Sequence, residues 1–295
     1  LKNSGDIYIN ESIKYGINGE DIYGDIPYEI AIGIAPDQPD LVEKRKGWNK
    51  PAPIEIALPN ETWRELIDRR KQYDNITTKI KNGEISNIND LITNNLDILQ
   101  FVQDALELSS DEKFIEYFYE SLSKISILDP TCGSGAFLFA AMNILEPLYE
   151  ACLRKIEEYS FKSKKEESSY SKRILSDAYA NENFNKQYFI FKTIILKNIY
   201  GVDIMKEAVE ISKLRLFLKL VSTIEPDTNK PNFGLDPLPD IDFNIRAGNT
   251  LVGFATEDEL GKGLRYTLDG LLAKPSIEAK CDLVSESFNN YKQVQ

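Results

Sequence analysis

An apolar run that ends on Asp129 is followed by two glycines, Gly133 and Gly135, and then at once by an apolar helical pattern from Ala136. This order predicts a strand, a tight turn and a helix, as in the nucleotide-binding corner of a doubly wound α/β sheet. The carboxylate of Asp129 would repel a pyrophosphate, and no Gly-Lys-Ser/Thr follows, so a phosphate-binding loop is excluded. A ligand that carries a cationic centre beside a nucleoside fits better, and S-adenosyl-L-methionine has both.

Two further segments could contact such a ligand. A second apolar run ends on Asp203, and in nucleotide-binding sheets the acid at the tip of the second strand accepts hydrogen bonds from both ribose hydroxyls. Asp129 and Asp203 are 74 residues apart (203 − 129), against a usual spacing of about twenty, so an insertion must loop out between the two strands. Asn249 follows the third predicted strand, and its amide could bind the adenine edge. An Asn chosen for its turn geometry explains that residue equally well.

Hydrophobic periodicity predicts the elements that position these residues. Residues 1–60 give short alternating stretches broken by prolines, which indicate irregular structure. A helix should begin at an Asn60 N-cap and stop at Gly83, a second should span 88–108, and a third should follow a Ser110 cap. The helix that follows the glycine loop meets Pro147, which should kink or restart it.

The second half of the chain continues the strand and helix pattern. A polar stretch near 154–197 is interpreted as an insertion, partly helical, whose charged face is solvated. An amphipathic helix should span 205–221. A proline-rich link then leads to the third strand and its turn within 241–253, and a last helix is expected over 273–292.

Composition excludes several classes of function. Histidine is absent, which excludes serine and cysteine triads and the usual zinc hydrolases. The three cysteines form no Cys-x-x-Cys pair, which argues against zinc sites and structural disulfides and fits a cytoplasmic protein. No run of 18 apolar residues predicts a membrane span. The net charge of −12 is the wrong sign for a segment that holds DNA by itself.

Three segments carry a resemblance to a known family. Residues 128–138, 199–204 and 246–251 resemble motifs I, II and III of the adenine-specific DNA methyltransferases. They are most similar to those of the large type II restriction-modification proteins that fuse methylation to restriction, and of the phage-defence methyltransferases similar to them. The similarity extends over 48–53, 58–70 and 89–98. It implies an α/β fold with a Rossmann-like class I S-adenosylmethionine-dependent methyltransferase core and a partial sheet, over residues 111–295, preceded by a mainly helical N-terminal region, 1–110.

The resemblance also implies a set of binding residues and an activity. The cofactor would be S-adenosyl-L-methionine, and the whole enzyme would methylate the exocyclic amine of adenine in double-stranded DNA. No metal is needed for that transfer. By this resemblance the cofactor-binding residues are Asp129, Pro130, Thr131, Cys132, Gly133, Ser134, Gly135, Phe137, Asp203, Ile204, Asn249 and Leu251.

One departure from the family pattern limits the expected activity. In the family a catalytic Asn/Asp-Pro-Pro-Tyr/Phe follows motif III, and none follows it here. Asp236-Pro237-Leu238-Pro239 lacks the aromatic residue, and Asp25-Ile26-Pro27-Tyr28 has Ile26 in place of the first proline. We therefore expect the cofactor-binding portion of a longer enzyme, inactive by itself, with DNA held by other parts. A non-catalytic S-adenosylmethionine-binding module and a methyltransferase for proteins or small molecules remain the alternatives.

The family fold also makes a prediction about the edge of the sheet. Strand one lies centrally in methyltransferases of this fold, between strands two and four. Without a fourth strand, the strand over 125–129 would have a row of unpaired backbone groups, which a stable protein must cover. We expect either residues 1–60 or a second chain to cover this edge.

Overall fold

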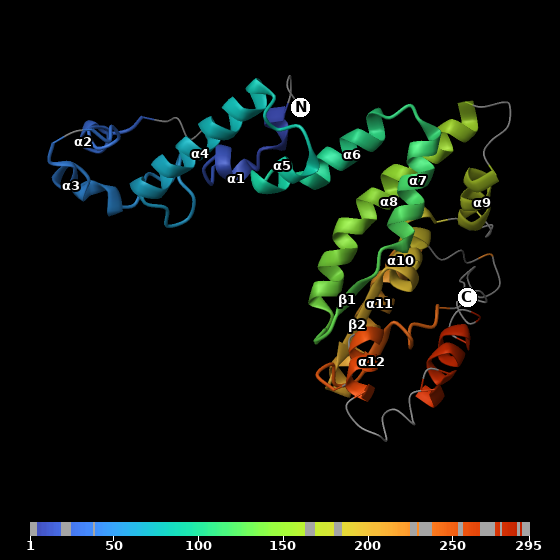
Figure 1. Ribbon diagram of the computed structural model, residues 1–295. Helices are drawn as coiled ribbons and strands as arrows, with labels where there is room; N and C mark the ends of the chain where they lie inside the picture. The colour runs from blue at the N-terminus through green and yellow to red at the C-terminus, as the bar shows by residue number, and fades with distance from the viewer. Residues whose placement is uncertain are drawn as a thin grey trace. The chain divides into compact units, whose positions relative to one another are not determined.

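The chain forms two compact units, Leu1–Ala105 and Leu106–Gln295, and each is described by itself. The computed structural model describes residues 5–18, 25–37, 39–162, 169–179, 185–224, 229, 238–252, 256–265, 275–277, 279–287 and 290. Figure 1 shows the helices and strands along the chain. The sequence places the boundary between its two regions a few residues later, after residue 110.

The first unit is helical. Its first sixty residues hold only short helical turns, because prolines interrupt every longer pattern. Longer helices begin after residue 62. The elements of this unit in chain order are η1 (Gly5–Tyr8), α1 (Glu11–Lys14), α2 (Tyr28–Ala31), α3 (Leu41–Lys44), η2 (Lys46–Asn49), α4 (Trp63–Asn82), α5 (Ile88–Thr93) and α6 (Ile98–Leu108).

The helix boundaries correct three predictions. The N-cap of α4 is Thr62, not Asn60, because Thr62 and Glu65 form a reciprocal capping box. The predicted helix over 88–108 is two helices, since Asn95 takes a left-handed conformation with φ of 51° between α5 and α6. Asp111 caps α7 (Glu112–Lys124) in place of Ser110, because its carboxylate accepts the N–H groups of Lys113 and Phe114.

A buried ion pair links the segments of the first unit. Arg69 on α4 donates from Nε and Nη2 to the two carboxylate oxygens of Glu61, at 2.7 and 2.6 Å. Its guanidinium also donates to backbone carbonyls of Ser12, Tyr15 and Ile56. A buried charge needs such partners, since an unpaired one costs several kcal/mol. The pair therefore holds the irregular N-terminal segment against α4.

The second unit contains a small parallel sheet. Its strands are β1 (Ile127–Asp129), β2 (Ile199–Asp203) and β3 (Ile245–Ala247), in the order β1-β2-β3. Asp129 pairs with Gly201, and Asp203 pairs with Ala247. The chain is thus mainly helical with a three-stranded parallel sheet, compatible with the predicted α/β class. Because the strands are parallel, their carboxyl ends meet at one edge of the sheet.

Helices pack on this sheet and on one another. The helices after α7 are α8 (Ala136–Lys162), α9 (Ser169–Ala178), α10 (Lys186–Lys197), α11 (Lys206–Val221) and α12 (Glu257–Arg265). α8 contacts β1, β2, α7 and α10, whereas α11 contacts β2, β3 and α10. Residues 275–277 and 279–287 are also helical, within the helix predicted over 273–292.

Three features of these helices bear on the expectations. Pro147 lies inside α8, so the helix does not restart there, and a kink at Pro147 stays a prediction. By length and composition α8 could cross a membrane, but it packs on the sheet and on α7 and α10, as a core helix does. The stretch interpreted as a polar insertion ends in α10, whose Ile190, Phe191 and Ile194 are buried. α10 therefore belongs to the core, because its sequence is strongly apolar.

Two buried asparagines fix the strands. Nδ2 of Asn198 donates to the carbonyls of Leu122 and Ile125, both at 2.8 Å, and its Oδ1 accepts the hydroxyl of Tyr149 at 2.8 Å. Asn198 thereby joins the end of α7, the entry to β1 and α8. Asn244 donates to carbonyls around the start of β2 in the same way. Every polar atom of the Asn198 side chain has a partner, as burial requires.

The outer edge of β1 has no strand beside it among the described residues. β1 pairs with β2 alone, and Leu128 is 58% exposed. The expectation that residues 1–60 or a second chain cover this edge stays a prediction. Within the first unit, the described alternating stretches of residues 1–60 form helical turns, and Ile9 bridges to Leu96.

Candidate functional site

The three strand ends that the sequence singled out meet at the carboxyl edge of the sheet. The backbone N–H of Gly133 donates to Oδ2 of Asp203 at 2.8 Å, so the loop after β1 touches the tip of β2. The hydroxyl of Thr250 donates to the carbonyl of Pro130 at 3.1 Å, so the turn after β3 touches the same loop. Parallel pairing explains the convergence, since each strand delivers its following loop to the same edge. The structure thus brings together the predicted site residues of all three segments.

The conformation of the loop requires glycine at position 135. Gly135 has φ of 83°, and a Cβ atom there would lie 2.6 Å from Oγ of Ser212 on α11. Any larger residue would therefore meet both backbone strain and a steric clash. Gly133 has φ of 51°, but a Cβ atom there would meet nothing within 4 Å. The close approach of the loop to α11 thus depends on Gly135 more than on Gly133.

Four backbone N–H groups of the loop donate hydrogen bonds to acceptors within the protein. Thr131 donates to Oδ1 of Asp129 at 3.1 Å, Cys132 to the carbonyl of Val202 at 2.9 Å, and Gly135 to the carbonyl of Cys132 at 2.7 Å. Gly133 donates to Asp203. A phosphate-binding loop instead points such N–H groups at its ligand. The described geometry therefore agrees with the argument from charge against a phosphate ligand.

The carboxylate of Asp203 binds the protein at both oxygens. The N–H of Met205 donates to Oδ1 at 2.9 Å, and that of Gly133 donates to Oδ2. The bonds from Met205 and then Gly133 lower the pKa of Asp203 below its ordinary 3.8, because they favour the charged form. A carboxylate offers about four lone-pair sites. One site on each oxygen thus stays available for two adjacent hydroxyl groups of a ligand.

The side chain of Cys132 lies between the loop and the sheet. Its side chain is 4% exposed, and its Sγ would be 3.0 Å from a Cβ atom at Gly201 of β2. Burial, followed by the charges of Asp129 and Asp203, raises the pKa of the Cys132 thiol. The thiol is therefore a packing group between the loop and the sheet, and only the backbone of Cys132 belongs to the loop surface.

The other predicted site residues lie on the exposed side of the same edge. Phe137 in the first turn of α8 is 57% exposed, Ile204 is 70% exposed and Leu251 is 92% exposed. Oδ1 of Asn249 accepts the N–H of Leu251 at 3.0 Å, which is an Asx turn. The turn role considered for Asn249 is therefore present, while its Nδ2 remains available as a donor. Exposed apolar and amide groups beside two carboxylates suit a nucleoside with a cationic centre.

Sequence reasoning missed the residues that hold the loop from outside. Arg215 on α11 donates from Nη1 to the carbonyl and hydroxyl oxygens of Ser134, at 2.7 and 3.1 Å. Thr250 and Ser212 contact the loop as described above. All three residues lie in segments whose periodicity or turn pattern gives no sign of contact with a distant loop. Only the pairing of the strands reveals it.

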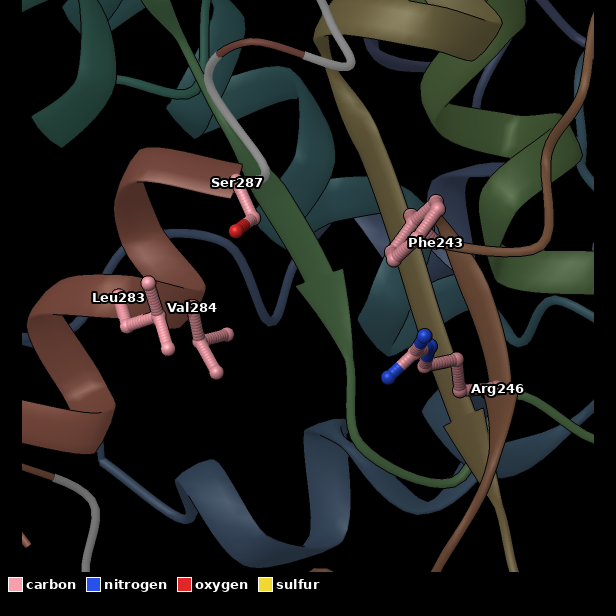
Figure 2. Close-up of a pocket in the computed structure, with 5 residues that line it drawn as sticks. All are labelled: Phe243, Arg246, Leu283, Val284 and Ser287. Atoms are coloured by element: carbon pink, nitrogen blue, oxygen red, sulfur yellow. The ribbon is translucent and has the colours of Figure 1, made fainter.

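A separate pocket lies between the segment at β3 and the C-terminal helical segment. It has a volume of about 490 Å³ and is lined by Phe243, Arg246, Leu283, Val284 and Ser287. Figure 2 shows that Phe243 and Arg246 come from the segment at β3, and the other three from the C-terminal helical segment. The guanidinium of Arg246 stacks at 4.8 Å from the centre of the Phe243 ring. The pocket contains no predicted site residue, so we place the candidate site at the loop.

Two sequence patterns from the N-terminal region lie in the first unit. Pro27 is the N-cap of α2, and Tyr28 begins that helix with an exposed ring. The Pro36-Asp37 dipeptide lies in a turn. Among the described residues, no group of three His, Cys, Asp or Glu side chains could hold a metal ion. Asp236 and Pro237 lie outside the described residues.

Comparisons with known proteins find a matching family and a relative for the region that contains the loop. Residues 105–250, which contain all three strands and the loop, match the family of the MmeI DNA-methyltransferase domain. A protein of Methanocaldococcus jannaschii, named as a proposed type II restriction enzyme and methyltransferase, is 32% identical over 192 residues, which are 65% of this chain and 14% of that protein. The chain therefore spans a small part of this relative's length. No solved structure gives a significant match. These findings support a methyltransferase domain of a restriction-modification system.

Proposed function

We propose that the second unit binds S-adenosyl-L-methionine as the cofactor-binding part of a DNA adenine N6-methyltransferase in a restriction-modification system. The observation that carries the proposal is the arrangement at the loop: the N–H groups of Thr131, Cys132, Gly133 and Gly135 are bound within the protein, while the carboxylates of Asp129 and Asp203 remain at its rim. Such a rim favours hydroxyl and cationic groups over phosphates. The match to the MmeI methyltransferase domain supports the same assignment.

Each predicted residue then has a role in binding. Asp129 would attract the cationic end of the cofactor, together with the loop from Pro130 to Gly135. Asp203 would accept the two ribose hydroxyls through the lone pairs that Gly133 and Met205 leave free. Ile204 and Leu251 would pack on the adenine ring, and Nδ2 of Asn249 would donate to its edge. Phe137 would cover the methionine end.

The cofactor supplies a methyl group activated by its sulfonium centre. The residues of this chain bind and orient it, so that an acceptor nitrogen can approach in line. For adenine in a duplex, the target base has to leave the helix stack first. We assign the binding of double-stranded DNA to other parts of the enzyme, because this chain has a net charge of −12.

Titration calorimetry tests the binding proposal. The chain should bind S-adenosyl-L-methionine and S-adenosylhomocysteine and should bind ATP poorly, because the carboxylates of Asp129 and Asp203 would repel its phosphates. Absence of binding to both sulfur ligands, or tighter binding of ATP, would overturn the assignment. Base specificity is tested on the full-length gene product. Labelled methyl groups transferred to duplex DNA should be recovered as N6-methyl-2′-deoxyadenosine and not as a methylated deoxycytidine.

A further inference from the structure

We propose that Arg215 is a positioning residue that holds the glycine loop in its binding form without touching the ligand. This inference rests on the proposed function, because it concerns the same loop. Arg215 lies on α11, 81 residues away from Ser134 in sequence. No sequence motif described above includes it, although its side chain donates two hydrogen bonds to the loop.

The geometry of Arg215 fixes one peptide group of the loop. Its Nη1 donates to the carbonyl of Ser134 at 2.7 Å and to the hydroxyl of the same residue at 3.1 Å. The N–H of the next residue, Gly135, donates to the carbonyl of Cys132 at 2.7 Å. The peptide between Ser134 and Gly135 is therefore bound at both its oxygen and its nitrogen. Its plane cannot rotate without breaking a hydrogen bond to a charged donor.

A second contact holds the guanidinium itself in place. The Cζ atom of Arg215 lies 4.6 Å from the centre of the Phe139 ring on α8. Stacking of this kind suits the flat guanidinium and limits its rotamers. Phe139 is in the helix that the loop begins, so Arg215 joins α11, the loop and the start of α8.

None of the ion pairs formed between described residues involves Arg215. Its donors go to the loop instead. Asp203 holds the N–H of Gly133 from the sheet side, and Arg215 holds the neighbouring residue from α11. The two contacts act on adjacent residues from two elements, which leaves the loop little freedom to change shape when a ligand arrives. Preorganisation of this kind strengthens binding by reducing the entropy that binding would otherwise cost.

The same helix provides a matched control. Lys219 lies one turn after Arg215 on α11, and its Nζ is 4.5 Å from the centre of the Phe191 ring on α10. Both residues thus place a cation over an aromatic ring of a neighbouring core helix. Only Arg215 reaches the loop. Replacing either residue with Met keeps a long apolar side chain for packing and removes the charge and the donors.

The test compares R215M, R215K and K219M with the wild-type chain by calorimetry with S-adenosylhomocysteine and by amide hydrogen exchange without ligand. We expect R215M to weaken binding roughly tenfold, the scale of one lost hydrogen bond to a charged group. R215K should lie between R215M and the wild type, because an ammonium can still donate to Ser134. K219M should bind like the wild type. In R215M the amides of Gly133 and Gly135 should exchange faster than in K219M.

The two measurements separate the possible failures. Equal affinity and equal loop exchange in R215M and the wild type would overturn the positioning role. Equal losses in R215M and K219M would also overturn it, because they would indicate a general effect of α11 packing. If the wild-type chain binds no sulfur ligand, the proposed function fails, and the exchange comparison alone decides whether Arg215 holds the loop. Unfolding midpoints in urea check that each variant is folded under the conditions used.

Discussion

The backbone N–H of Gly133 donates to Oδ2 of Asp203 at 2.8 Å, although 70 residues separate them in sequence. Asp203, which the sequence predicts to bind the ligand, therefore also holds the loop that would contact that ligand. Met205 occupies a site on the other oxygen at 2.9 Å. A substitution of Asp203 should consequently change two properties at once: contact with the ligand and the shape of the loop.

The first prediction separates these two roles. Asp203→Asn keeps one side-chain oxygen for a backbone N–H, whereas Asp203→Ala removes both acceptors. We expect Asp203→Ala to weaken binding of S-adenosylhomocysteine on the order of tenfold to a hundredfold, and Asp203→Asn to weaken it less. Calorimetry measures both. Binding of the Ala variant with wild-type affinity would show that Asp203 contacts neither the ligand nor a loop that matters for binding.

The second prediction concerns pH. The pKa of Asp203 is lowered below 3.8 in the folded chain by the N–H groups of Met205 and Gly133. A lowered pKa means that the carboxylate stabilises the fold above pH 3.8, and that this contribution is lost as the pH falls through the folded pKa. The difference in unfolding midpoint between the wild type and Asp203→Asn should thus be constant from about pH 7 to 5. It should shrink in acid below that range. A difference that grows in acid would contradict the assigned sign.

Much of the site was predictable from the sequence because strand ends and glycine turns leave local signals. The acid at the end of an apolar run, as at Asp129 and Asp203, marks the carboxyl edge of a parallel sheet. The helix over 205–221 was predictable for a similar reason, since its buried residues recur at helical spacing. These signals depend on neighbours in the sequence and need no knowledge of the tertiary fold.

The features that were missed depend on contacts between distant residues. Periodicity places Arg215 on α11, but only tertiary packing directs it to Ser134. The end of α5 was missed because Asn95 adopts a left-handed conformation within an otherwise helical pattern. α10 was assigned to an insertion because the polar residues before it dominate the composition of that stretch. Its own buried residues pack against helices that are distant in sequence.

The third prediction uses the two loop glycines as a matched pair. Gly135→Ala places a Cβ atom 2.6 Å from Oγ of Ser212 and keeps φ of 83°, whereas Gly133→Ala adds only left-handed strain of about 1–2 kcal/mol. We expect Gly135→Ala to be the more destabilising in urea. Ser212→Ala by itself should be nearly neutral or stabilising, because the buried hydroxyl has no partner among the described residues.

The double variant makes this prediction sharper. Ser212→Ala removes the closest atom to the new Cβ, so it should recover part of the stability that Gly135→Ala loses. Additive effects of the two changes would contradict a direct contact between Gly135 and Ser212.

The fourth prediction tests Asn198. Asn198→Ala removes three hydrogen bonds, two to the carbonyls of Leu122 and Ile125 and one from the hydroxyl of Tyr149. Because these polar groups are buried, the free energy of unfolding should fall by about 3 kcal/mol or more. Asn198→Asp should be at least as harmful, because it buries a charge and replaces the donor by an acceptor. Asn143, exposed on α8, provides a control, and its replacement with Ala should change stability little. Similar stability of Asn198→Ala and Asn143→Ala in urea would contradict the role of Asn198.

The fifth prediction concerns the outer edge of β1. The backbone N–H and C=O groups of Ile127 and Asp129 point toward β2. Those of Leu128 therefore point to the opposite side, where no described residue adds a strand. An edge with unpaired N–H and C=O groups and an exposed Leu side chain invites pairing with a second copy of the chain.

We expect the chain to self-associate in sedimentation equilibrium, and Leu128→Lys to shift it toward monomer, because a charged residue disfavours edge pairing. Leu251→Lys changes a leucine that is also exposed but lies after β3, and it should leave the association constant unchanged. A wild-type chain that stays monomeric at all concentrations, or equal weakening by both lysines, would count against a β1-edge dimer.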